Sequence, residues 1–328
     1  MKNKTCIGID IGGTNTVFGL IDGNGNILER RAIKTQEYRT MAQYLSATEE
    51  NIARFTAAGG TDGVQGIGIG APSGNFYKGC IEAQAANLPV KECIPLKQIL
   101  EHDLHLPVTV DNDANAAAYG ELMFGGAVGM RDIIMITLGT GVGSGIVVDG
   151  KIVHGHSGLA GELGHSTVFP DGRTCHCGRK GCLEAYASAD GICNNYKELL
   201  EHQGNPLTPA QTKTLTCKLI GELATSGDPT AAAAYDRAAY ALGIALANAV
   251  NFSSPQAIFL TGGPTRVGDI LLKPLRKHFS EHLLFLYQGT VTLQRSALPD
   301  SDAALLGAAA LCLEQSLKQS DVLDCLAH

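Results

Sequence analysis

The amino-acid sequence predicts an α/β protein made of two related halves. Stretches typical of β-strands alternate along the chain with stretches typical of helices, which is the pattern of α/β architecture. In addition, a unit of apolar strand, glycine turn, second apolar strand and Asp-Gly occurs twice. Repetition on this scale indicates two related half-molecules. Two unrelated hairpins in a glycine-rich chain are the alternative.

Composition limits the class of protein. A chain of 328 residues is long enough for two ordinary domains, and 45% apolar and 17% charged residues are typical of a globular protein. The net charge of −7 argues against a nucleic-acid-binding surface, which usually carries a basic excess. No apolar stretch reaches the roughly 20 residues that cross a bilayer, and Asp10 interrupts the apolar start too early for a signal peptide. We therefore expect a cytoplasmic protein with no membrane or nucleic-acid partner.

Hydrophobic alternation and turn residues place the elements in order. The expected strands are Lys4–Gly12, Thr14–Asp22, Asn26–Thr35, Val64–Gly70, Pro107–Val110, Asp132–Thr140, Gly145–Val148, Ala257–Thr261 and Thr290–Arg295. The expected helices are Thr40–Ala58, the Ala-rich Asp113–Phe124, Ala231–Asn251 and a last helix that begins at Asp302. The turn Asp22-Gly23-Asn24-Gly25 joins the second strand to the third as a hairpin.

The two copies of the repeated unit each contain a glycine turn between apolar strands. Residues 9–14 (IDIGGT) continue to Ile21-Asp22-Gly23, and residues 136–141 (ITLGTG) continue to Val148-Asp149-Gly150. Glycine lets backbone N–H groups approach an anion closely, and Thr14 and Thr140 add hydroxyl donors. Asp10 precedes the first turn, where a carboxylate can hold Mg²⁺ through water. Taken alone, each turn is more often only a turn; the pair with an aspartate favours phosphate binding.

A third glycine turn, Gly262-Gly263, ends the strand at Ala257–Thr261 and would let a nucleotide base or ribose lie against the backbone. Two common nucleotide motifs are rejected. Residues 145–151 match most of a P-loop, but Ile152 stands where a Ser or Thr should reach magnesium. The Rossmann pattern of three glycines is not cleanly met at either turn of the repeat.

Asp113 is a candidate catalytic base. The run Asp111-Asn112-Asp113 follows a short strand and opens the Ala-rich helix. In the functional interpretation Asp113 accepts the proton of a sugar hydroxyl while Asn112 hydrogen-bonds a neighbouring hydroxyl. In the structural interpretation these residues only cap the helix, a common role of Asn and Asp, and the local sequence favours the cap. Both interpretations are compatible, because a capping turn fixes a side chain at the edge of a cleft.

A metal site is expected at His165, Cys175, Cys177 and Cys182. Three cysteines within eight residues, separated by glycine turns, suit a closed tetrahedral Cys₃His zinc site with no open position for catalysis. Free surface thiols are the alternative, and His176 competes with His165 as the fourth ligand. Glu162 and Glu184 flank the cluster, where each would pair with an arginine or accept hydrogen bonds from sugar hydroxyls.

With these pieces on one chain, the sequence resembles the ROK family of sugar kinases and sugar-responsive repressors, within the actin-like ATPase superfamily. The likeness runs from the DIGGT segment at Asp10 to the last helix, and its most specific part is GELGH followed by CHCGRKGCLE, residues 161–184. The resemblance implies a two-lobed actin-like ATPase (ribonuclease H-like) fold with a zinc-stabilised loop. It implies a smaller lobe of residues 1–112, completed by the C-terminal helix of about 302–328, and a larger lobe of residues 113–301.

The resemblance also implies roles for individual residues. Asp113 is the implied catalytic base, and Asp10 the implied magnesium ligand. The implied sugar contacts are Gly74, Asn87, Asn112, Asp113, Glu162, His165 and Glu184. The implied ATP contacts are Asp10, Gly12, Gly13, Thr14, Gly139, Thr140, Gly141, Gly262 and Gly263. His165, Cys175, Cys177 and Cys182 are the implied zinc ligands. Ser73 departs from the family, many members of which have glycine there.

The function implied by the resemblance is ATP-dependent phosphorylation of a hexose, with glucose to glucose 6-phosphate expected first. Kinases for N-acetylmannosamine, N-acetylglucosamine, allose or fructose share nearly every motif. ROK repressors carry a helix-turn-helix before the first phosphate loop, whereas nine residues precede Asp10 here, which favours a kinase. A sugar-sensing regulator without catalysis is the alternative from another class. Family members are commonly dimers or tetramers, so a homo-oligomer is expected.

Overall fold

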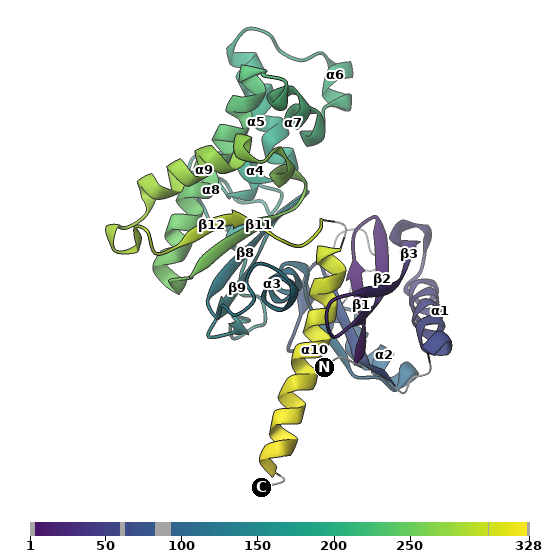
Figure 1. The fold of residues 1–328 in the computed structure, drawn as a ribbon. Coiled ribbons are helices and arrows are strands. Elements are labelled where there is room, and N and C mark those ends of the chain that lie inside the picture. The colour runs from purple at the N-terminus through teal and green to yellow at the C-terminus, as the bar shows by residue number, and fades with distance from the viewer. Residues whose placement is uncertain (1–3, 60–62, 83–92, 301, 327–328) are drawn as a thin grey trace. The chain divides into compact units, whose positions relative to one another are not determined.

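The structure, a computed structural model, describes residues 4–59, 63–82, 93–300 and 302–326 (Figure 1). The chain forms two compact units. Unit 1 comprises residues 1–129, 152–160 and 297–328, and unit 2 comprises residues 130–151 and 161–296. Unit 1 therefore includes residues 113–129, which the sequence-based division assigned to the larger lobe. No helix in the described part of the chain is long and apolar enough to cross a membrane.

Unit 1 is built on a five-stranded mixed sheet. Its strands are β1 (Thr5–Ile11), β2 (Asn15–Asp22), β3 (Ile27–Lys34), β4 (Val64–Ala71) and β7 (Val108–Asn112). Their order is β3-β2-β1-β4-β7; β1, β2 and β3 pair antiparallel, whereas β1, β4 and β7 run parallel. The short strands β5 (Gly74–Asn75) and β6 (Cys80–Ile81) form a separate antiparallel pair. The three parallel strands end at one edge of the sheet.

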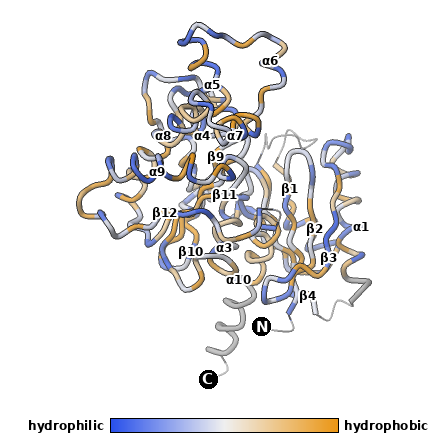
Figure 2. The backbone as a smooth tube through the Cα atoms, turned by 45° about the horizontal axis from the view of Figure 1, so that its top comes forward, coloured by the Kyte–Doolittle hydropathy of each residue, from blue (hydrophilic) through white to orange (hydrophobic). Residues whose placement is uncertain are grey.

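Helices cover both faces of this sheet. They are η1 (Thr35–Glu37), α1 (Met41–Gly59), α2 (Leu96–Leu104), α3 (Asp113–Phe124) and α10 (Ala303–Leu326). Side chains alternate between the two faces of a strand. Ile7 and Ile9 accordingly share a buried cluster with α1 and α2, while Gly8 meets α10. Hydrophilic and hydrophobic stretches alternate along α1, as one buried face requires (Figure 2).

The contact between α10 and the sheet depends on glycine. A Cβ atom on Gly68 would lie 1.9 Å from the Ala308 carbonyl oxygen, and one on Gly8 would lie 2.6 Å from that of Leu305. Backbone therefore packs directly on backbone, which no other residue type allows at these two positions. The sequence interval between β4 and α10 is more than 200 residues, so this packing closes unit 1 over a long stretch of chain.

Unit 2 repeats the topology of unit 1. Its strands are β8 (Ile133–Leu138), β9 (Val142–Val148), β10 (Lys151–Ile152), β11 (Ala257–Thr261) and β12 (Thr292–Arg295). The sheet order is β10-β9-β8-β11-β12, with β8 antiparallel to β9 and parallel to β11. The hairpin β8–β9 thus occupies in unit 2 the position of the hairpin β1–β2 in unit 1. The expectation of two related halves is confirmed at the level of topology.

The second half of the chain supplies most of the helices. In unit 2 these are η3 (Leu163–His165), α4 (Glu184–Ala187), α5 (Ala189–His202), α6 (Pro209–Thr214), α7 (Cys217–Thr225), α8 (Pro229–Ser253), η4 (Gly263–Val267), α9 (Asp269–His282) and η5 (Phe285–Tyr287). The side chain of Asp228 caps α8 by accepting a hydrogen bond from the Ala231 N–H (2.7 Å), and Pro229 follows at the first helical position.

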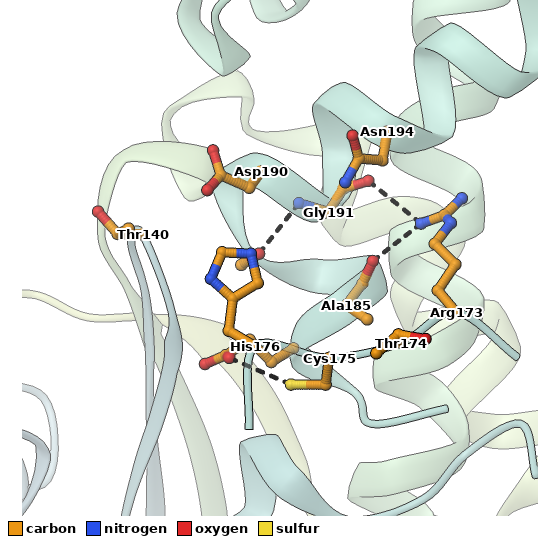
Figure 3. A pocket seen from close by; sticks show the side chains of 11 residues that line it. Thr140, Arg173, Thr174, Cys175, His176, Ala185, Asp190, Gly191 and Asn194 are labelled. Carbon is orange, nitrogen blue, oxygen red and sulfur yellow. Dashed lines mark hydrogen bonds between the residues drawn. The ribbon is translucent and has the colours of Figure 1, made fainter. Parts of the chain in front are cut away.

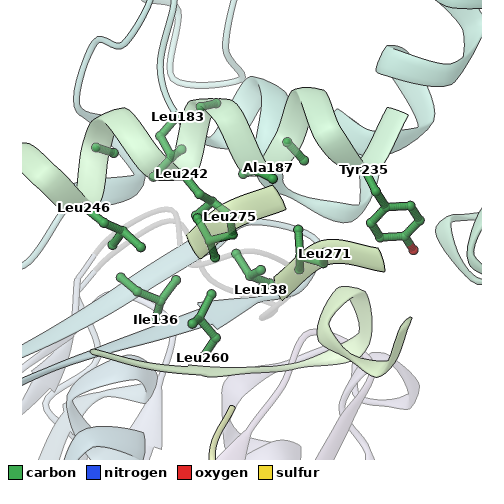
Figure 4. Packing of buried hydrophobic residues seen from close by; sticks show 14 of the residues in the cluster. Ile136, Leu138, Leu183, Ala187, Tyr235, Leu242, Leu246, Leu260, Leu271 and Leu275 are labelled. Carbon is green, nitrogen blue, oxygen red and sulfur yellow. The ribbon is translucent and has the colours of Figure 1, made fainter. Parts of the chain in front are cut away.

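The core of unit 2 lies between α8 and the sheet (Figure 4). Leu242 and Leu246 of α8 face Ile136 and Leu138 of β8 and Leu260 of β11, all nearly inaccessible to solvent. Small alanines at other buried positions of α8 let neighbouring elements approach closely. This core fixes the carboxyl ends of β8 and β11, from which two of the predicted nucleotide loops emerge.

Replacing Gly68 with alanine tests the backbone contact between β4 and α10. Because the new Cβ would overlap the Ala308 carbonyl, we expect Gly68→Ala to lower the free energy of unfolding by at least about 3 kcal/mol. Urea denaturation followed by circular dichroism measures the change. Gly63→Ala is the matched control, because its Cβ would lie 3.7 Å from Thr5 Oγ1, an ordinary contact. Equal stability of the two variants would contradict the packing argument.

Candidate active site

The first glycine turn connects β1 to β2 in unit 1. The Gly12 N–H donates to the Asn15 carbonyl (2.9 Å), and a Cβ on Gly12 would lie 2.9 Å from that oxygen. Thr14 is exposed and its carbonyl accepts from the Thr35 N–H (2.9 Å). The turn is therefore tight and is held to Thr35 by a backbone hydrogen bond, with Thr14 exposed to solvent. This is the form expected of an anion-binding loop.

A buried chain of hydroxyl groups supports this turn. The Thr35 hydroxyl donates to the Gly12 carbonyl (2.9 Å) and lies 3.0 Å from the Thr16 hydroxyl, which in turn lies 2.9 Å from the Tyr44 hydroxyl. Thr16, Thr35 and Tyr44 are fully buried, and burial raises the pKa of Tyr44 to about 12. These hydrogen-bonded hydroxyl groups link α1 to the glycine turn. Because they are neutral, they hold the turn in place without adding charge. Sequence reasoning did not identify this support.

Asp10 and Asp113 lie at the same edge of the unit 1 sheet. Asp10 is in register with Gly70 of β4, and Gly70 is in register with Asp111 of β7. The strands β1 and β7 therefore end at the same level of the sheet, on either side of β4. Burial raises the pKa of Asp10 to about 6, and the negative charge of Asp113 adds to the effect. The carboxyl ends of parallel strands are where ligands bind in α/β proteins. A cation held here would reverse the cost of ionising Asp10.

The start of α3 separates the roles of Asn112 and Asp113. Asn112 is the N-cap, and its Oδ1 accepts a hydrogen bond from the Ala114 N–H (2.8 Å). Asp113 is the first helical residue and its side chain is exposed. The cap that the local sequence favours is therefore real, but it belongs to Asn112. Because Oδ1 already accepts this bond, the amide N–H groups of Asn112 are the ones left to donate to a ligand.

A buried acidic residue, Asp111, holds the start of α3 in place through hydrogen bonds. Asp111 is fully buried; its Oδ1 accepts from the Asn112 N–H (2.7 Å) and from Asn115 Nδ2 (2.8 Å), and its Oδ2 lies 2.6 Å from His154 Nε2. The His154 ring stacks on Phe76 with ring centroids 4.2 Å apart. Asp111 and His154 thereby fix the backbone that presents Asn112 and Asp113. The sequence carried only the Asp-Asn-Asp run as a signal for Asp111, and none for His154.

The predicted sugar-side loop of unit 1 also packs against this strand. A Cβ on Gly74 would lie 2.2 Å from the Asp111 carbonyl oxygen, so only glycine fits there. Ser73 has a φ of 55°, a left-handed conformation that favours glycine, which is the residue many family members have at this position. Ser73 adopts this conformation in the structure although it is not glycine. Asn87 lies outside the described residues, and its predicted role stays a prediction.

The second glycine turn connects β8 to β9 in unit 2. The Gly139 N–H donates to the Gly141 carbonyl (2.9 Å), and the Gly139 carbonyl accepts from the Ala189 N–H at the start of α5 (2.8 Å). Thr140 at the tip is exposed. Gly262 is held against the end of β8, where its Cβ would lie 2.0 Å from the Leu138 carbonyl. The structure thus brings the second and third predicted nucleotide turns together within unit 2.

His165, Cys175, Cys177 and Cys182 form one cluster, with their ligand atoms within 4.8 Å of one another. His165 Nδ1 lies 3.7 Å from Cys175 Sγ, and the sulfur atoms of Cys177 and Cys182 are also 3.7 Å apart. Two sulfurs on one tetrahedral zinc are separated by about 3.8 Å, given Zn–S bonds of about 2.3 Å. The donor set and its spacing fit zinc, and His165 rather than His176 completes it. The structure brings the four predicted ligands into one cluster, and the binding of zinc there stays a prediction.

The backbone prepares the thiols of this cluster. The backbone N–H of Arg179 lowers the pKa of the Cys177 thiol to about 6, whereas burial raises that of Cys175 to about 12. Tight turns hold the segment: the Gly178 N–H donates to the Cys175 carbonyl (2.9 Å) and the Cys175 N–H to the Arg179 carbonyl (2.7 Å). One ligand is thus a thiolate near neutral pH, and zinc would favour the deprotonated form of the others.

Glu184 connects this cluster to the second glycine turn. Its Oε1 lies 3.5 Å from Cys175 Sγ, and its Oε2 accepts a hydrogen bond from the Val142 N–H (3.1 Å). A Cβ on Gly141 would lie 2.6 Å from the same Oε2. The glycine at 141 therefore leaves room for a carboxylate as well as exposing the turn. This contact was not foreseen from the sequence, which suggested an arginine or a sugar hydroxyl as the partner of Glu184.

A polar pocket lies beside these groups (Figure 3). Thr140 from the turn and His176 from the cysteine segment line it, together with Ser188 and Asp190 at the start of α5. Arg173 contributes to the wall and is held by a bidentate ion pair with Glu198 (2.5 and 2.7 Å). The exposed tip of the predicted phosphate loop therefore borders a pocket whose lining offers hydroxyl and imidazole groups.

The segment containing Glu162 is fixed to β9. Ser144 Oγ donates to the Gly161 carbonyl and accepts from the Leu163 N–H (3.1 Å). A Cβ on Gly164 would lie 2.0 Å from the Val142 carbonyl, so the segment rests directly on the strand. Glu162 itself is exposed. Of the predicted sugar contacts, Glu162, His165 and Glu184 belong to unit 2, and Gly74, Asn112 and Asp113 belong to unit 1.

A match to the ROK family spans residues 6–315. This chain belongs to the ROK family. Glucokinase of Halalkalibacterium halodurans is 38% identical over 290 residues, 87% of this chain and 88% of that protein. The crystal structure of a ROK family glucokinase from Streptomyces griseus, in complex with glucose and AMPPNP, is 34% identical with a TM-score of 0.75, and the match covers 94% of this chain and 98% of that one.

Repressors also occur among the relatives of this ROK protein. The xylose repressor of Caldicellulosiruptor bescii is 30% identical over 262 residues, which are 78% of this chain and 64% of that protein. The predicted family and fold class are confirmed: the chain has the α/β two-lobed actin-like fold of ROK proteins, with a mixed sheet in each unit and a cysteine–histidine cluster that fits the family's zinc motif.

Asp10→Asn tests the electrostatics at the edge of the unit 1 sheet. A raised folded-state pKa means that folding is favoured by the protonated form. The stability from Asp10 is therefore complete below its unfolded pKa of 3.8 and is lost as pH rises through about 6. An asparagine at position 10 does not ionise, so the variant does not lose this stability as pH rises. In magnesium-free buffer, we expect the variant to gain about 2–3 kcal/mol over the wild type between pH 4 and pH 7, by urea denaturation. A pH-independent difference would contradict this.

Cys177→Ser tests the zinc cluster. Because the binding free energy of a structural zinc is also folding free energy, we expect the variant to lose the metal of this cluster and more than about 2 kcal/mol of stability. Metal analysis by mass spectrometry and thermal unfolding measure the two losses. Cys217→Ser is the control: Cys217 contacts the Tyr235 hydroxyl at 3.3 Å, far along the chain from the cluster. Full metal content in Cys177→Ser would exclude this cysteine as a ligand.

Proposed function

We propose that this ROK protein is an ATP-dependent sugar kinase that transfers the γ-phosphoryl group of ATP to a hexose hydroxyl. Glucose, phosphorylated at the 6-hydroxyl, is the proposed first substrate. The observation that carries the proposal is the exposed carboxylate of Asp113 near the half-buried carboxylate of Asp10 at the same edge of the unit 1 sheet. Glucokinase relatives of 34–38% identity, one of them bound to glucose and an ATP analogue, support the choice of reaction and substrate.

In the proposed reaction Asp113 orients the sugar hydroxyl and accepts its proton. Phosphoryl transfer usually passes through a loose transition state, so positioning and charge neutralisation provide most of the catalysis. Asn112 would donate to a neighbouring hydroxyl through its amide, since its carbonyl oxygen caps α3. The buried pair of Asp111 and His154 would keep both side chains in place. Exposure suits Asp113 for this role, because a proton acceptor must reach its substrate.

The glycine turns would hold the nucleotide. In the proposed complex the backbone N–H groups and the threonine hydroxyls of the turns at Gly12–Thr14 and Gly139–Gly141 donate to phosphate oxygens. The Gly262-Gly263 turn would lie against the base or ribose. A magnesium ion bound with ATP would neutralise the phosphate charge, and the Asp10 carboxylate would hold that ion, directly or through water. The pKa of Asp10, raised to about 6, still leaves it mostly ionised at neutral pH.

Zinc has a supporting role in this proposal. When bound, it would stabilise the loop from which His165 and Glu184 reach the sugar, without an open position for substrate. The contact of Glu184 with both Cys175 and the Val142 N–H would transmit that stabilisation to the second glycine turn. The expected homo-oligomer, a dimer or a tetramer, stays a prediction.

An ADP-release assay across glucose, mannose, fructose, allose, N-acetylglucosamine and N-acetylmannosamine tests the proposed function. We expect the highest kcat/KM with glucose. Turnover with another sugar of the set would keep the kinase and replace the substrate. The presence of a repressor among the relatives favours one competing function, a sugar-sensing regulator. Sugar binding without any ATP turnover would establish that regulator and overturn the kinase.

Asp113→Ala tests the proposed catalytic base. Because a general base typically contributes about 10²–10⁴-fold, we expect kcat to fall by that factor while the sugar still binds. Initial rates and isothermal titration calorimetry with the sugar separate the two effects. Asp269→Asn serves as the control, since Asp269 is an exposed residue at the start of α9 in unit 2. A kcat within about twofold of the wild type would remove Asp113 from the mechanism.

A further inference from the structure

A second group of metal-ligating side chains lies in unit 1, next to the small sheet of β5 and β6. It consists of Cys80, Glu82 and Cys93, whose ligand atoms all lie within 4.8 Å of one another. Cys80 is buried, Glu82 is half-buried and Cys93 is exposed. The proposed kinase reaction uses none of them. The spacing of these three residues along the sequence does not suggest a metal site, so the group can be recognised only in the folded structure.

Strand pairing explains why these three residues meet. Ile81 and Ile94 form an antiparallel bridge with two backbone hydrogen bonds of 3.0 and 2.9 Å. In that register Glu82 lies opposite Cys93, and Cys80 is the diagonal neighbour of Cys93. Because side chains alternate along a strand, Cys80 and Glu82 point to the same face as Cys93. The backbone, rather than chance proximity of flexible side chains, therefore brings the donors together.

This geometry favours a metal ion over a disulfide. Diagonal neighbours in an antiparallel pair have Cα atoms about 7–8 Å apart, beyond the roughly 4.4–6.8 Å that a disulfide spans. A tetrahedral zinc ion needs its two sulfurs only about 3.8 Å apart, so donors within 4.8 Å require a closure of about 1 Å. Side-chain rotation alone provides such a movement, and the bridge at Ile81 and Ile94 need not change.

Neighbouring polar groups already orient the carboxylate. Glu82 Oε1 accepts hydrogen bonds from Lys78 Nζ (2.7 Å) and from Asn75 Nδ2 (3.0 Å). Asn75 is fully buried, and its amide also donates to the Ser157 carbonyl (2.9 Å), so it holds Glu82 from a fixed position. The second carboxylate oxygen, Oε2, remains for a cation. Outer partners of this kind orient the ligands of many protein metal sites.

We propose that Cys80, Glu82 and Cys93 bind a divalent zinc ion, distinct from the ion of the His165 cluster. Two thiolates and a carboxylate carry three negative charges, zinc neutralises two of them, and the Lys78 ammonium offsets the third. Thiolate ligands select zinc over magnesium or calcium. Three protein ligands leave the fourth position to water, so this site binds more weakly than the closed four-ligand cluster. The ion cross-links β6 to the segment at Cys93 and Ile94.

Cobalt substitution of the full-length protein tests this site. Purified protein is stripped of metal under reducing conditions and reloaded with Co²⁺, and bound cobalt and thiolate-to-cobalt absorption are measured. We expect about two cobalt ions per wild-type chain and about one in Cys93→Ser, because one thiolate site is lost and the other retained. Cys177→Ser should lose the other ion, and Cys217→Ser should keep both. Because Cys93 is exposed, its replacement leaves the core of unit 1 intact.

Glu82→Gln provides the second variant. It keeps the shape of the side chain but removes the charge, so we expect the second cobalt ion to leave at a lower chelator concentration than in the wild type. Wild-type cobalt content in Cys93→Ser would overturn the proposal. So would a Cys80–Cys93 disulfide, found by peptide mass spectrometry in protein purified without reductant, together with a single bound metal. These readouts need no sugar or ATP, so they stand apart from the kinase assays.

Discussion

Direct packing of backbone on backbone at glycine is the constraint on which the rest of the structure depends. In unit 1, Gly68 and Gly8 let α10 rest on β4 and β1, and the pairing of β1, β4 and β7 brings Asp10 and Asp113 to one edge. In unit 2, Gly262 rests on the end of β8 in the same manner. In this protein, glycine is therefore needed where helices and loops pack on strands as well as in the turns. These contacts help to hold the strand ends that carry the proposed site residues.

A single carboxylate connects the cysteine–histidine cluster to the second glycine turn in unit 2. Glu184 follows the last cysteine of the zinc motif by two positions, contacts Cys175 and accepts a hydrogen bond from the backbone of the second glycine turn. A structural metal is often regarded as remote from catalysis. Here one side chain, Glu184, contacts both the cysteine segment and the turn, so the two are directly connected. A side chain at position 141 would collide with Glu184 Oε2, so glycine there leaves room for this contact.

Local patterns predicted the hairpins, α3 and β11, because alternation, turn residues and an Ala-rich stretch are properties of neighbouring residues. What escaped depends on distant contacts. β5 and β6 are two residues each and leave no periodic signal, and Pro274 lies inside α9. The placement of α3 in unit 1 follows from packing against α10, nearly 200 residues later. The zinc ligands were predicted because their spacing is local, whereas Cys80, Glu82 and Cys93 needed the strand pairing to become visible.

The two copies of the repeated topology differ in charge at one corresponding position. Asp10 is the second residue of the first repeated segment (residues 9–14), and Thr137 is the second residue of the other (residues 136–141). One copy thus carries an ionisable group that responds to cations and acidity, and its twin carries an uncharged hydroxyl. Under the proposed function, this one difference would place a carboxylate at only one of the two phosphate-binding turns, so the two halves of the repeat would contribute unequally to binding magnesium and nucleotide.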